Sequence, residues 1–244
     1  MCGRYTLTAD KTQVAKEFRL HEVQLNDLAP QYNIAPGRLV PILYEAPEPP
    51  RNPTGFVTAQ SLNRSDSRAE PRVGLFRWGL IPSWSKDPSI GSQLINARKE
   101  TLAEKPSFKG PFQNQRCLIL ADGFYEWKPE GARKVPYYIH LKSKRPFGFA
   151  GLWSHWMGSD GSEIYSCTII TGEPNELVVP IHNRMPVILG KNQRSEWLDP
   201  SNHNIRALMN LLESYPADEM EAYPVSNRVK LGINAESVSR FEKQ

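Results

Sequence analysis

Short apolar runs separated by turn-forming residues are the feature that most limits how this chain can fold. With 21 prolines and 16 glycines among 244 residues, few segments can continue as a long regular helix. Strand-like runs are predicted at 39–44, 75–80, 117–125, 136–141, 147–152, 164–171 and 186–189. Because loops rather than regular helices join most of them, we predict an α+β fold. Its sheet should be strongly curved, largely antiparallel or mixed, a pseudo-barrel flanked by short helices.

Helical patterns are few and short. The spacing of Val14 and Phe18 predicts a helix between Asp10 and Leu20. Further helical segments are predicted at 96–104, 173–179, 195–197 and 204–213.

A polar, proline-rich stretch at 46–72 is interpreted as a variable loop insertion with a short strand near Phe56-Val57. The strands on either side of it are short and need one another. Residues 1–244 are therefore expected to form a single domain.

Composition excludes several classes of protein. No stretch approaches the roughly 20 apolar residues of a membrane span, and the start of the chain does not resemble a signal peptide, so an intracellular (cytoplasmic) protein is expected. Three cysteines without a C-x-x-C pair predict neither a disulfide framework nor a zinc site. Cys117 and Cys167 lie in apolar runs and are interpreted as core residues. A net charge of +4 is compatible with a nucleic-acid partner without establishing one.

Cys2 becomes the N-terminal residue if Met1 is removed. A free amine and a thiol on adjacent carbons can condense with an aldehyde, first to an imine and then to a five-membered thiazolidine ring. The α-amine has an ordinary pKa of about 7.7–8.0, so it is partly deprotonated near neutral pH. The alternative is a frayed terminus without a function.

Two tryptophans, Trp78 and Trp84, flank a Gly-Leu-Ile-Pro-Ser segment, with Arg77 and Lys86 beside them. Aromatic side chains next to cations are typical of surfaces on which nucleic-acid bases stack. The alternative is that both tryptophans belong to the core.

Three polar residues are candidates for chemistry. Asn96 stands where an apolar strand is predicted to give way to a helix, or else it merely caps that helix. Glu126 lies between Tyr125 and Trp127, where desolvation can raise the pKa of a carboxyl, unless it is an exposed strand residue or an ion-pair partner. His182 stands in a proline-flanked turn and is either an acid–base group or a surface residue.

Seven motifs in order resemble the SOS response-associated peptidase (SRAP) family, whose members process abasic sites and crosslink to DNA. The resemblance runs from residue 1 to about 225. Its motifs are Met1-Cys2-Gly3-Arg4, Trp78-Gly79-Leu80 with Trp84, Asn96-Ala97-Arg98-x-Glu100-Thr101, Arg116-Cys117, Asp122-Gly123-Phe124-Tyr125-Glu126-Trp127, Ala150-Gly151-Leu152-Trp153 and His182-x-Arg184-Met185-Pro186.

By this resemblance, Cys2 forms a Schiff base with the ring-opened aldehyde of an abasic site and closes the thiazolidine. The crosslink protects the lesion, and β-elimination from the imine would be a lyase-like side reaction. The resemblance implies that Glu126 shuttles protons, that His182 is an acid–base partner for the imine, and that Asn96 orients the terminal residue or the sugar.

The resemblance also implies a DNA-binding surface for single-stranded DNA that contains abasic sites. Arg4, Arg98 and Arg184 would bind phosphates, Trp84 would stack at a single-strand/duplex junction, and Pro36 would line the channel. Neither a metal nor an organic cofactor is implied, and a monomer is expected.

Two rival functions remain open from the residues. An N-terminal cysteine peptidase or autopeptidase would use Cys2 as nucleophile, His182 as base, and Glu126 or Asn96 as orienting residue. A non-catalytic single-strand binding protein would need the aromatic and basic residues but not Cys2.

Overall fold

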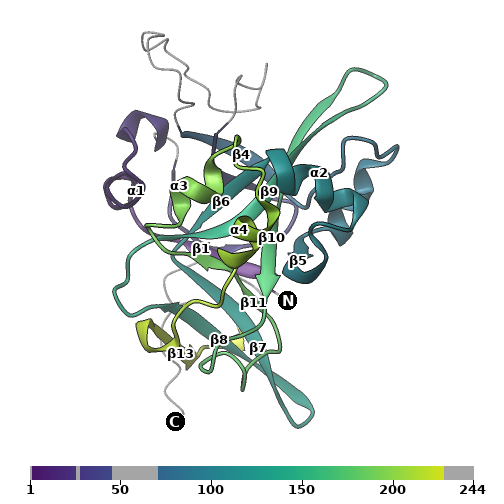
Figure 1. Cartoon of the computed structure of the whole chain (residues 1–244). Helices are drawn as coiled ribbons and strands as arrows, with labels where there is room; N and C mark the ends of the chain where they lie inside the picture. Colours follow the sequence, from purple (N-terminus) through teal and green to yellow (C-terminus); the bar gives the residue numbers. More distant parts are fainter. Residues whose placement is uncertain (1, 26–27, 46–70, 228–244) are drawn as a thin grey trace.

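Five strands close into a barrel at the centre of the molecule, shown in the computed structural model of Figure 1, which describes residues 2–25, 28–45 and 71–227. Each strand pairs with the next, and the last pairs back with the first. In order around the barrel, the strands are β10 (Glu163–Gly172), β4 (Arg72–Trp78), β3 (Leu39–Tyr44), β6 (Arg116–Ala121) and β9 (Phe147–Met157). Only the β4–β10 pair of this barrel is parallel, so the predicted α+β fold with a curved, largely antiparallel sheet is confirmed.

Three short strands extend the barrel sheet. β5 (Asn96–Arg98) runs parallel to β10, β11 (Met185–Pro186) is antiparallel to β10, and β12 (Ile188–Leu189) is antiparallel to β9.

A second, fully antiparallel sheet contains the N-terminal strand. Its order is β13 (Met220–Pro224), β8 (Arg133–Leu141), β7 (Gly123–Glu130), β1 (Arg4–Leu7) and β2 (Gln31–Ile34). Asp122 alone separates β6 of the barrel from β7 of this sheet, so the run predicted as one strand at 117–125 is two strands. Figure 1 shows the β7–β8 hairpin projecting from the barrel.

The helices are short. They are α1 (Lys11–Phe18), α2 (Pro106–Asn114), α3 (Arg194–Leu198) and α4 (Ile205–Asn210), with 3₁₀ segments η1 (Glu22–Leu25), η2 (Pro88–Gln93), η3 (Lys99–Thr101) and η4 (Ala217–Glu219). α1 confirms the helix predicted near the N-terminus and begins with a capping box between Asp10 and Gln13. Among the described residues, no helix is long and apolar enough to cross a membrane.

Some local predictions were wrong. The helix predicted at 96–104 is instead β5 followed by η3, because pairing of Asn96 with Ile169 on β10 outweighs the helix propensity of the sequence. The helix predicted at 173–179 is absent from this described segment, in which 176–179 form turns. α2 was not predicted, since it contains Pro111 in its interior. The strand proposed near Phe56-Val57 lies outside the described residues.

The core is rich in aromatic side chains. Tyr5 from β1 packs edge-on against Trp78 and Phe149 of the barrel, with ring centroids 5.2 and 5.7 Å apart, and so joins the two sheets. Cys117 and Cys167 are buried and free, as predicted.

Asp122 holds the end of the N-terminal strand. Its carboxylate accepts hydrogen bonds from the hydroxyl of Thr6, the backbone N–H and hydroxyl of Thr8 (2.7 Å for the hydroxyl), and the backbone N–H of Ala9 (2.8 Å). These donors belong to the last part of β1 and to the two residues that follow it, so a single carboxylate fixes the end of that strand. A charged acceptor makes such bonds stronger than neutral ones.

We expect Asp122→Ala to lower the free energy of unfolding by about 3 kcal/mol, because it leaves the half-buried N–H of Thr8 and the buried N–H of Ala9 without an acceptor. Urea unfolding measures the change. Asp87→Ala is the matched control, since Asp87 accepts bonds from Ser89 at an exposed turn, and its effect should be much smaller. Equal effects of the two substitutions would contradict the role given to Asp122.

Candidate active site

Cys2 is delivered into the interior by β1. Arg4 pairs with Tyr125 of β7, so the residues before Arg4 run alongside Glu126, the next residue of that strand. Cys2 is fully buried, and its Sγ lies 3.8 Å from the backbone oxygen of Arg4. Burial raises the pKa of the Cys2 thiol well above its ordinary value, and the charge of Glu126 adds to the effect.

Asn96 fixes the backbone of Cys2. Its Nδ2 donates a hydrogen bond of 2.8 Å to the carbonyl oxygen of Cys2, across 94 positions in the sequence. β5 can present Asn96 there because it is held beside β10 in parallel register. The Oδ1 atom of Asn96 is buried and accepts no hydrogen bond within the described part of the chain. An acceptor therefore faces the interior next to Cys2.

Glu126 and His182 face each other. Oε2 of Glu126 lies 3.9 Å from Nε2 of His182, and Glu126 is only 2% exposed. Burial raises the pKa of Glu126 from 4.5 to about 7. Burial likewise lowers the pKa of His182 below its ordinary 6.5. Both shifts favour the uncharged forms, so near neutral pH a partly protonated carboxyl faces a neutral imidazole.

The turn that carries His182 also holds its ring in place. Nδ1 lies 3.0 Å from the backbone nitrogen and 3.1 Å from the carbonyl oxygen of Arg184. These contacts orient the ring so that Nε2 is the nitrogen nearest Glu126. The turn is closed by the His182 N–H, which bonds to the Val178 carbonyl at 2.9 Å.

Trp84 and Trp78 have different environments, so a platform of two tryptophans and the alternative that both belong to the core are both wrong. Trp78 is buried, and its Nε1 donates to the Ile95 carbonyl. Trp84 is 59% exposed on a turn from Pro82 to Ser85, and Trp156 holds this turn by donating to the Ser85 carbonyl at 2.7 Å. One large aromatic surface is thus presented to solvent on a fixed turn.

The bend after Trp78 needs glycine. Gly79 has a φ of +128°, and a Cβ there would meet the backbone oxygen of Gly91 at 2.5 Å. The Trp-Gly motif therefore lets two backbone segments pack closely below the exposed turn.

The basic residues predicted to bind DNA are in three different states. Arg4 is half-buried and donates to Oδ1 of Asn33 at 3.1 Å. Arg98 is exposed. Arg184 forms a two-point ion pair with Glu100, with distances of 2.8 and 2.9 Å. Pro36 is half-buried in the turn whose next residue, Gly37, bonds to the Trp78 carbonyl.

A cavity of about 570 Å³ adjoins His182. Its walls consist of Arg98, Glu100, Thr101, His182, Asn183 and Arg184. The β5–η3 segment and the His182 turn thus enclose a polar space, and two of the predicted phosphate-binding arginines line it.

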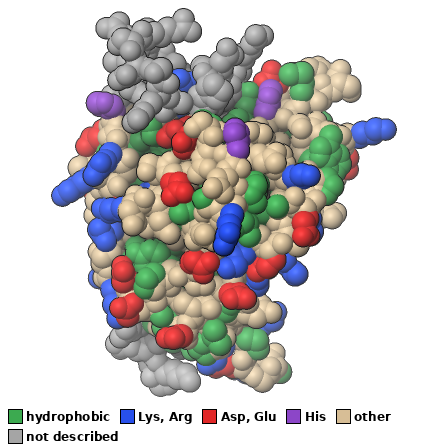
Figure 2. All heavy atoms as spheres, viewed as in Figure 1, with side chains coloured by type: hydrophobic (Ala, Val, Ile, Leu, Met, Phe, Trp, Pro, Cys, Tyr) green, Lys and Arg blue, Asp and Glu red, His purple; other side chains and the backbone are tan. Residues whose placement is uncertain are grey.

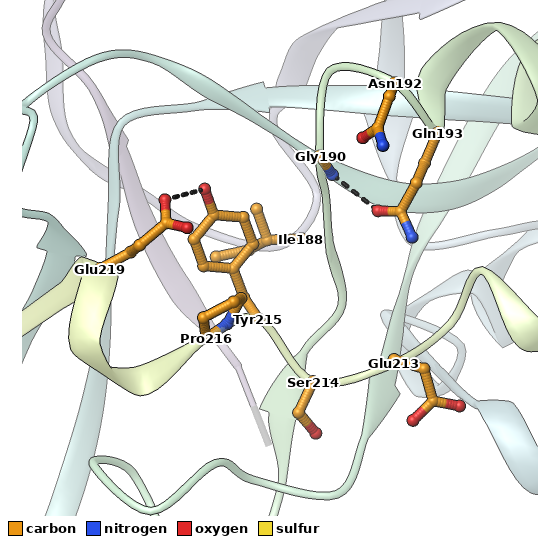
Figure 3. A pocket seen from close by; sticks show the side chains of 9 residues that line it. All are labelled: Ile188, Gly190, Asn192, Gln193, Glu213, Ser214, Tyr215, Pro216 and Glu219. Carbon is orange, nitrogen blue, oxygen red and sulfur yellow. Dashed lines mark hydrogen bonds between the residues drawn. The ribbon is translucent and has the colours of Figure 1, made fainter.

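A second pocket, of about 360 Å³, is lined by none of the predicted site residues (Figure 3). Figure 3 shows Tyr215 donating to Glu219 and Gln193 accepting from the Gly190 N–H, so several of its polar groups satisfy one another. On the face shown in Figure 2, acidic and basic side chains are interspersed. Neither the second pocket nor the charge of this face identifies a functional site.

Two residues that sequence reasoning left without a role are central to this geometry. Asp122 directs β1, and Glu100 holds Arg184. Both residues stand inside motifs of the family resemblance given above, and this membership was the sequence feature that could have indicated a role for them. Within residues 2–25, 28–45 and 71–227, no group of three His, Cys, Asp or Glu side chains could hold a metal ion.

Comparison with known proteins gives consistent matches over nearly the whole chain. A family model described as SOS response associated peptidase (SRAP) matches residues 1–231. Abasic site processing protein YoqW of Bacillus subtilis is 42% identical over 231 residues, covering 94% of each chain. Abasic site processing protein HMCES of Gallus gallus is 32% identical over 254 residues, covering 94% of this chain and 74% of that one. A crystal structure of a protein from Bacteroides thetaiotaomicron aligns with a TM-score of 0.82 and 29% identity, covering 99% of this chain and 100% of that one.

The raised pKa of Glu126 predicts a measurable cost in stability. The folded-state pKa of about 7 exceeds the ordinary 4.5, so stability is lost as pH rises through this range and stays lost above it. Glu126→Gln removes the loss. We expect its stability relative to the native protein to be greater at pH 8 than at pH 5 by about 2–3 kcal/mol, because a tenfold change in proton affinity corresponds to about 1.4 kcal/mol.

Urea unfolding of both proteins at the two pH values checks this. Glu130→Gln is the control, because Glu130 lies exposed near the end of the same strand and should show no such difference. If Glu126→Gln behaved like the control, burial would not raise the pKa of Glu126.

Proposed function

This chain belongs to the SOS response-associated peptidase (SRAP) family, and from that premise we propose that it senses abasic sites in single-stranded DNA and crosslinks to them through Cys2. The observation that carries the proposal is the meeting of Cys2, Asn96, Glu126 and His182, which come from separate segments. Relatives named abasic site processing proteins support the substrate.

The proposed nucleophile is the α-amine of Cys2, which exists only after Met1 has been removed. The hydrogen bond from Asn96 to the Cys2 carbonyl restricts rotation of the Cys2 backbone and so helps to orient the amine and the thiol of Cys2. Holding both nucleophiles next to one carbonyl carbon replaces a bimolecular encounter by an internal one.

Glu126 would act first. An abasic sugar equilibrates between a closed hemiacetal and a ring-opened aldehyde, and opening requires a proton on the ring oxygen. A carboxyl with a pKa of about 7 is part acid and part base near neutral pH, so Glu126 can donate this proton and later accept one.

The covalent steps then balance without a redox partner. The amine adds to C1′ of the aldehyde, and loss of one water gives the imine. The thiol then adds across the C=N bond, so that sulfur bonds to C1′ and the thiol proton passes to nitrogen. His182, whose Nε2 faces Glu126, would exchange protons at the carbinolamine and imine stages.

The surrounding residues would position the strand. Trp84 would stack on a base at a single-strand/duplex junction, Pro36 would line the channel, and Arg4, Arg98 and Arg184 would bind phosphates flanking the lesion. For Arg184, this requires that a phosphate replace Glu100. We propose that the protein acts as a monomer.

Two other activities use the same residues. β-Elimination from the imine before the ring closes would give a lyase-like reaction. A peptidase would need a Cys2 thiolate, yet burial raises the pKa of this thiol, which disfavours that use. Thiazolidine closure attacks a far more electrophilic carbon, so it depends less on the thiolate.

We expect Cys2→Ser to abolish the covalent adduct with single-stranded DNA that contains one abasic site, while noncovalent affinity is retained. Serine keeps the amine, but its hydroxyl closes the ring poorly, so any product is a hydrolysable imine. Denaturing electrophoresis and intact mass detect the adduct and the loss of Met1. Cys117→Ala is the control and should crosslink normally, since Cys117 is a buried core residue. An unchanged adduct with Cys2→Ser would overturn the proposal.

We expect Trp84→Ala to weaken binding of single-stranded DNA about tenfold, within the roughly 1–3 kcal/mol that stacking contributes per base. Fluorescence anisotropy measures the affinity. Met157→Ala is the matched control, because Met157 is 60% exposed and is likewise apolar, and it should bind normally. Equal affinities for the two variants would remove Trp84 from the DNA-binding surface.

A further inference from the structure

The guanidinium of Arg184 is already occupied in the protein without DNA. Its Nη1 and Nη2 donate to the two carboxylate oxygens of Glu100, and Nη2 also donates to the Thr171 carbonyl at 2.5 Å. Nε is buried and has no partner among the described residues. A guanidinium can bind two oxygens at once through its Nη1/Nη2 edge or its Nε/Nη2 edge. Glu100 fills the first edge of Arg184, and the second faces the interior, so neither is open to a phosphate.

Carboxylate and phosphate compete for the same arginine geometry. Both present two oxygens at a spacing that matches the guanidinium fork. The Arg184 guanidinium holds the pKa of the Glu100 carboxyl below its ordinary value, so Glu100 is charged whenever the pair is formed near neutral pH. Glu100 thus stands where a DNA phosphate would have to bind.

The two partners differ in how firmly they are held. The Arg184 side chain is 16% exposed and is anchored by the Thr171 carbonyl, whereas that of Glu100 is 44% exposed on the short η3 segment. Release of Glu100 into solvent therefore costs less than movement of Arg184. A phosphate entering the cavity of about 570 Å³ would displace the carboxylate and leave the arginine in place.

We propose that Glu100 is a specificity-determining residue, whose carboxylate occupies Arg184 and must be displaced by a DNA phosphate, so that strands without a lesion are held weakly. The proposal rests on the proposed function. The competition weakens noncovalent binding of every strand alike. Only a strand with an abasic site goes on to a covalent bond, which no longer depends on that affinity. Undamaged single strands are released, and lesions are retained.

An opposite role for Glu100 makes an opposite prediction. Arg184 also donates its backbone N–H to Nδ1 of His182, so Glu100 could serve only to position this turn. In that case, loss of its charge would loosen the site and weaken binding. The sign of the change in affinity separates the two roles.

The experiment measures the affinity of an undamaged single-stranded oligonucleotide by fluorescence anisotropy at fixed salt for E100Q, R184A and the double variant. We expect E100Q to bind about two- to fivefold more tightly than the native protein, the scale of a half-exposed ion pair. R184A should bind more weakly. In the R184A background, E100Q should raise the affinity no more than the control substitution E104Q does.

E104Q is the matched control, because Glu104 is exposed a few residues further along and its removal changes net charge equally. A gain for E100Q no larger than for E104Q, a loss of affinity, or an equal gain in the R184A background would each overturn the proposal. Absence of binding by every variant would do so too. Thermal unfolding of each variant confirms that it is folded.

Crosslinking of abasic DNA is measured separately with the same proteins. If undamaged DNA binds but no adduct forms, the proposed crosslinking fails while the Glu100 proposal is still decided by the affinities. If adducts form but E100Q binds no more tightly than E104Q, the Glu100 proposal fails while the proposed crosslinking is supported.

Discussion

Burial of the chain's second residue is the constraint on which the rest of the structure depends. A terminus normally frays, because its few contacts do not compensate the entropy of ordering it. Here β1 lies between β2 and β7, Tyr5 anchors it against Trp78 and Phe149, and Asp122 accepts hydrogen bonds from the residues that follow. Cys2 is therefore fixed against Asn96 and beside Glu126 without a long element of its own.

The same burial sets the electrostatics of the site. Burial favours the neutral form of Glu126, and the proton transfer proposed for it requires a carboxyl that is partly protonated near pH 7. As a consequence, the folded protein should be less stable at higher pH than a variant with an uncharged residue at position 126. His182 shares this environment, and the contacts of its Nδ1 with the Arg184 backbone turn Nε2 toward Glu126. Burial of Glu126 and His182 therefore favours the proposed proton transfer but lowers the stability of the protein at higher pH.

The sequence could predict residues whose chemistry is local, and it could not predict their partners. Cys2, Glu126 and His182 stand out by type and neighbours, and short apolar runs joined by loops predicted the curved sheet. The helix predicted at 96–104 failed because the contact that decides it, with β10, lies more than 70 residues away. Trp78 and Trp84 look equivalent in sequence, yet only the fold buries one and exposes the other. The pairing of Arg184 with Glu100 is likewise a property of the fold, since 84 positions separate them.

In the proposed function, the amine and the thiol of Cys2 together capture an aldehyde of DNA. The most direct measurement is peptide mapping by mass spectrometry of the adduct formed on abasic single-stranded DNA, after nuclease and protease digestion, with and without borohydride. We expect a sugar remnant on an N-terminal peptide that begins at Cys2. It should form with loss of one water and be unchanged by borohydride, as a closed thiazolidine would be. An adduct on a lysine, or one on Cys2 that borohydride reduces as an open imine, would contradict it.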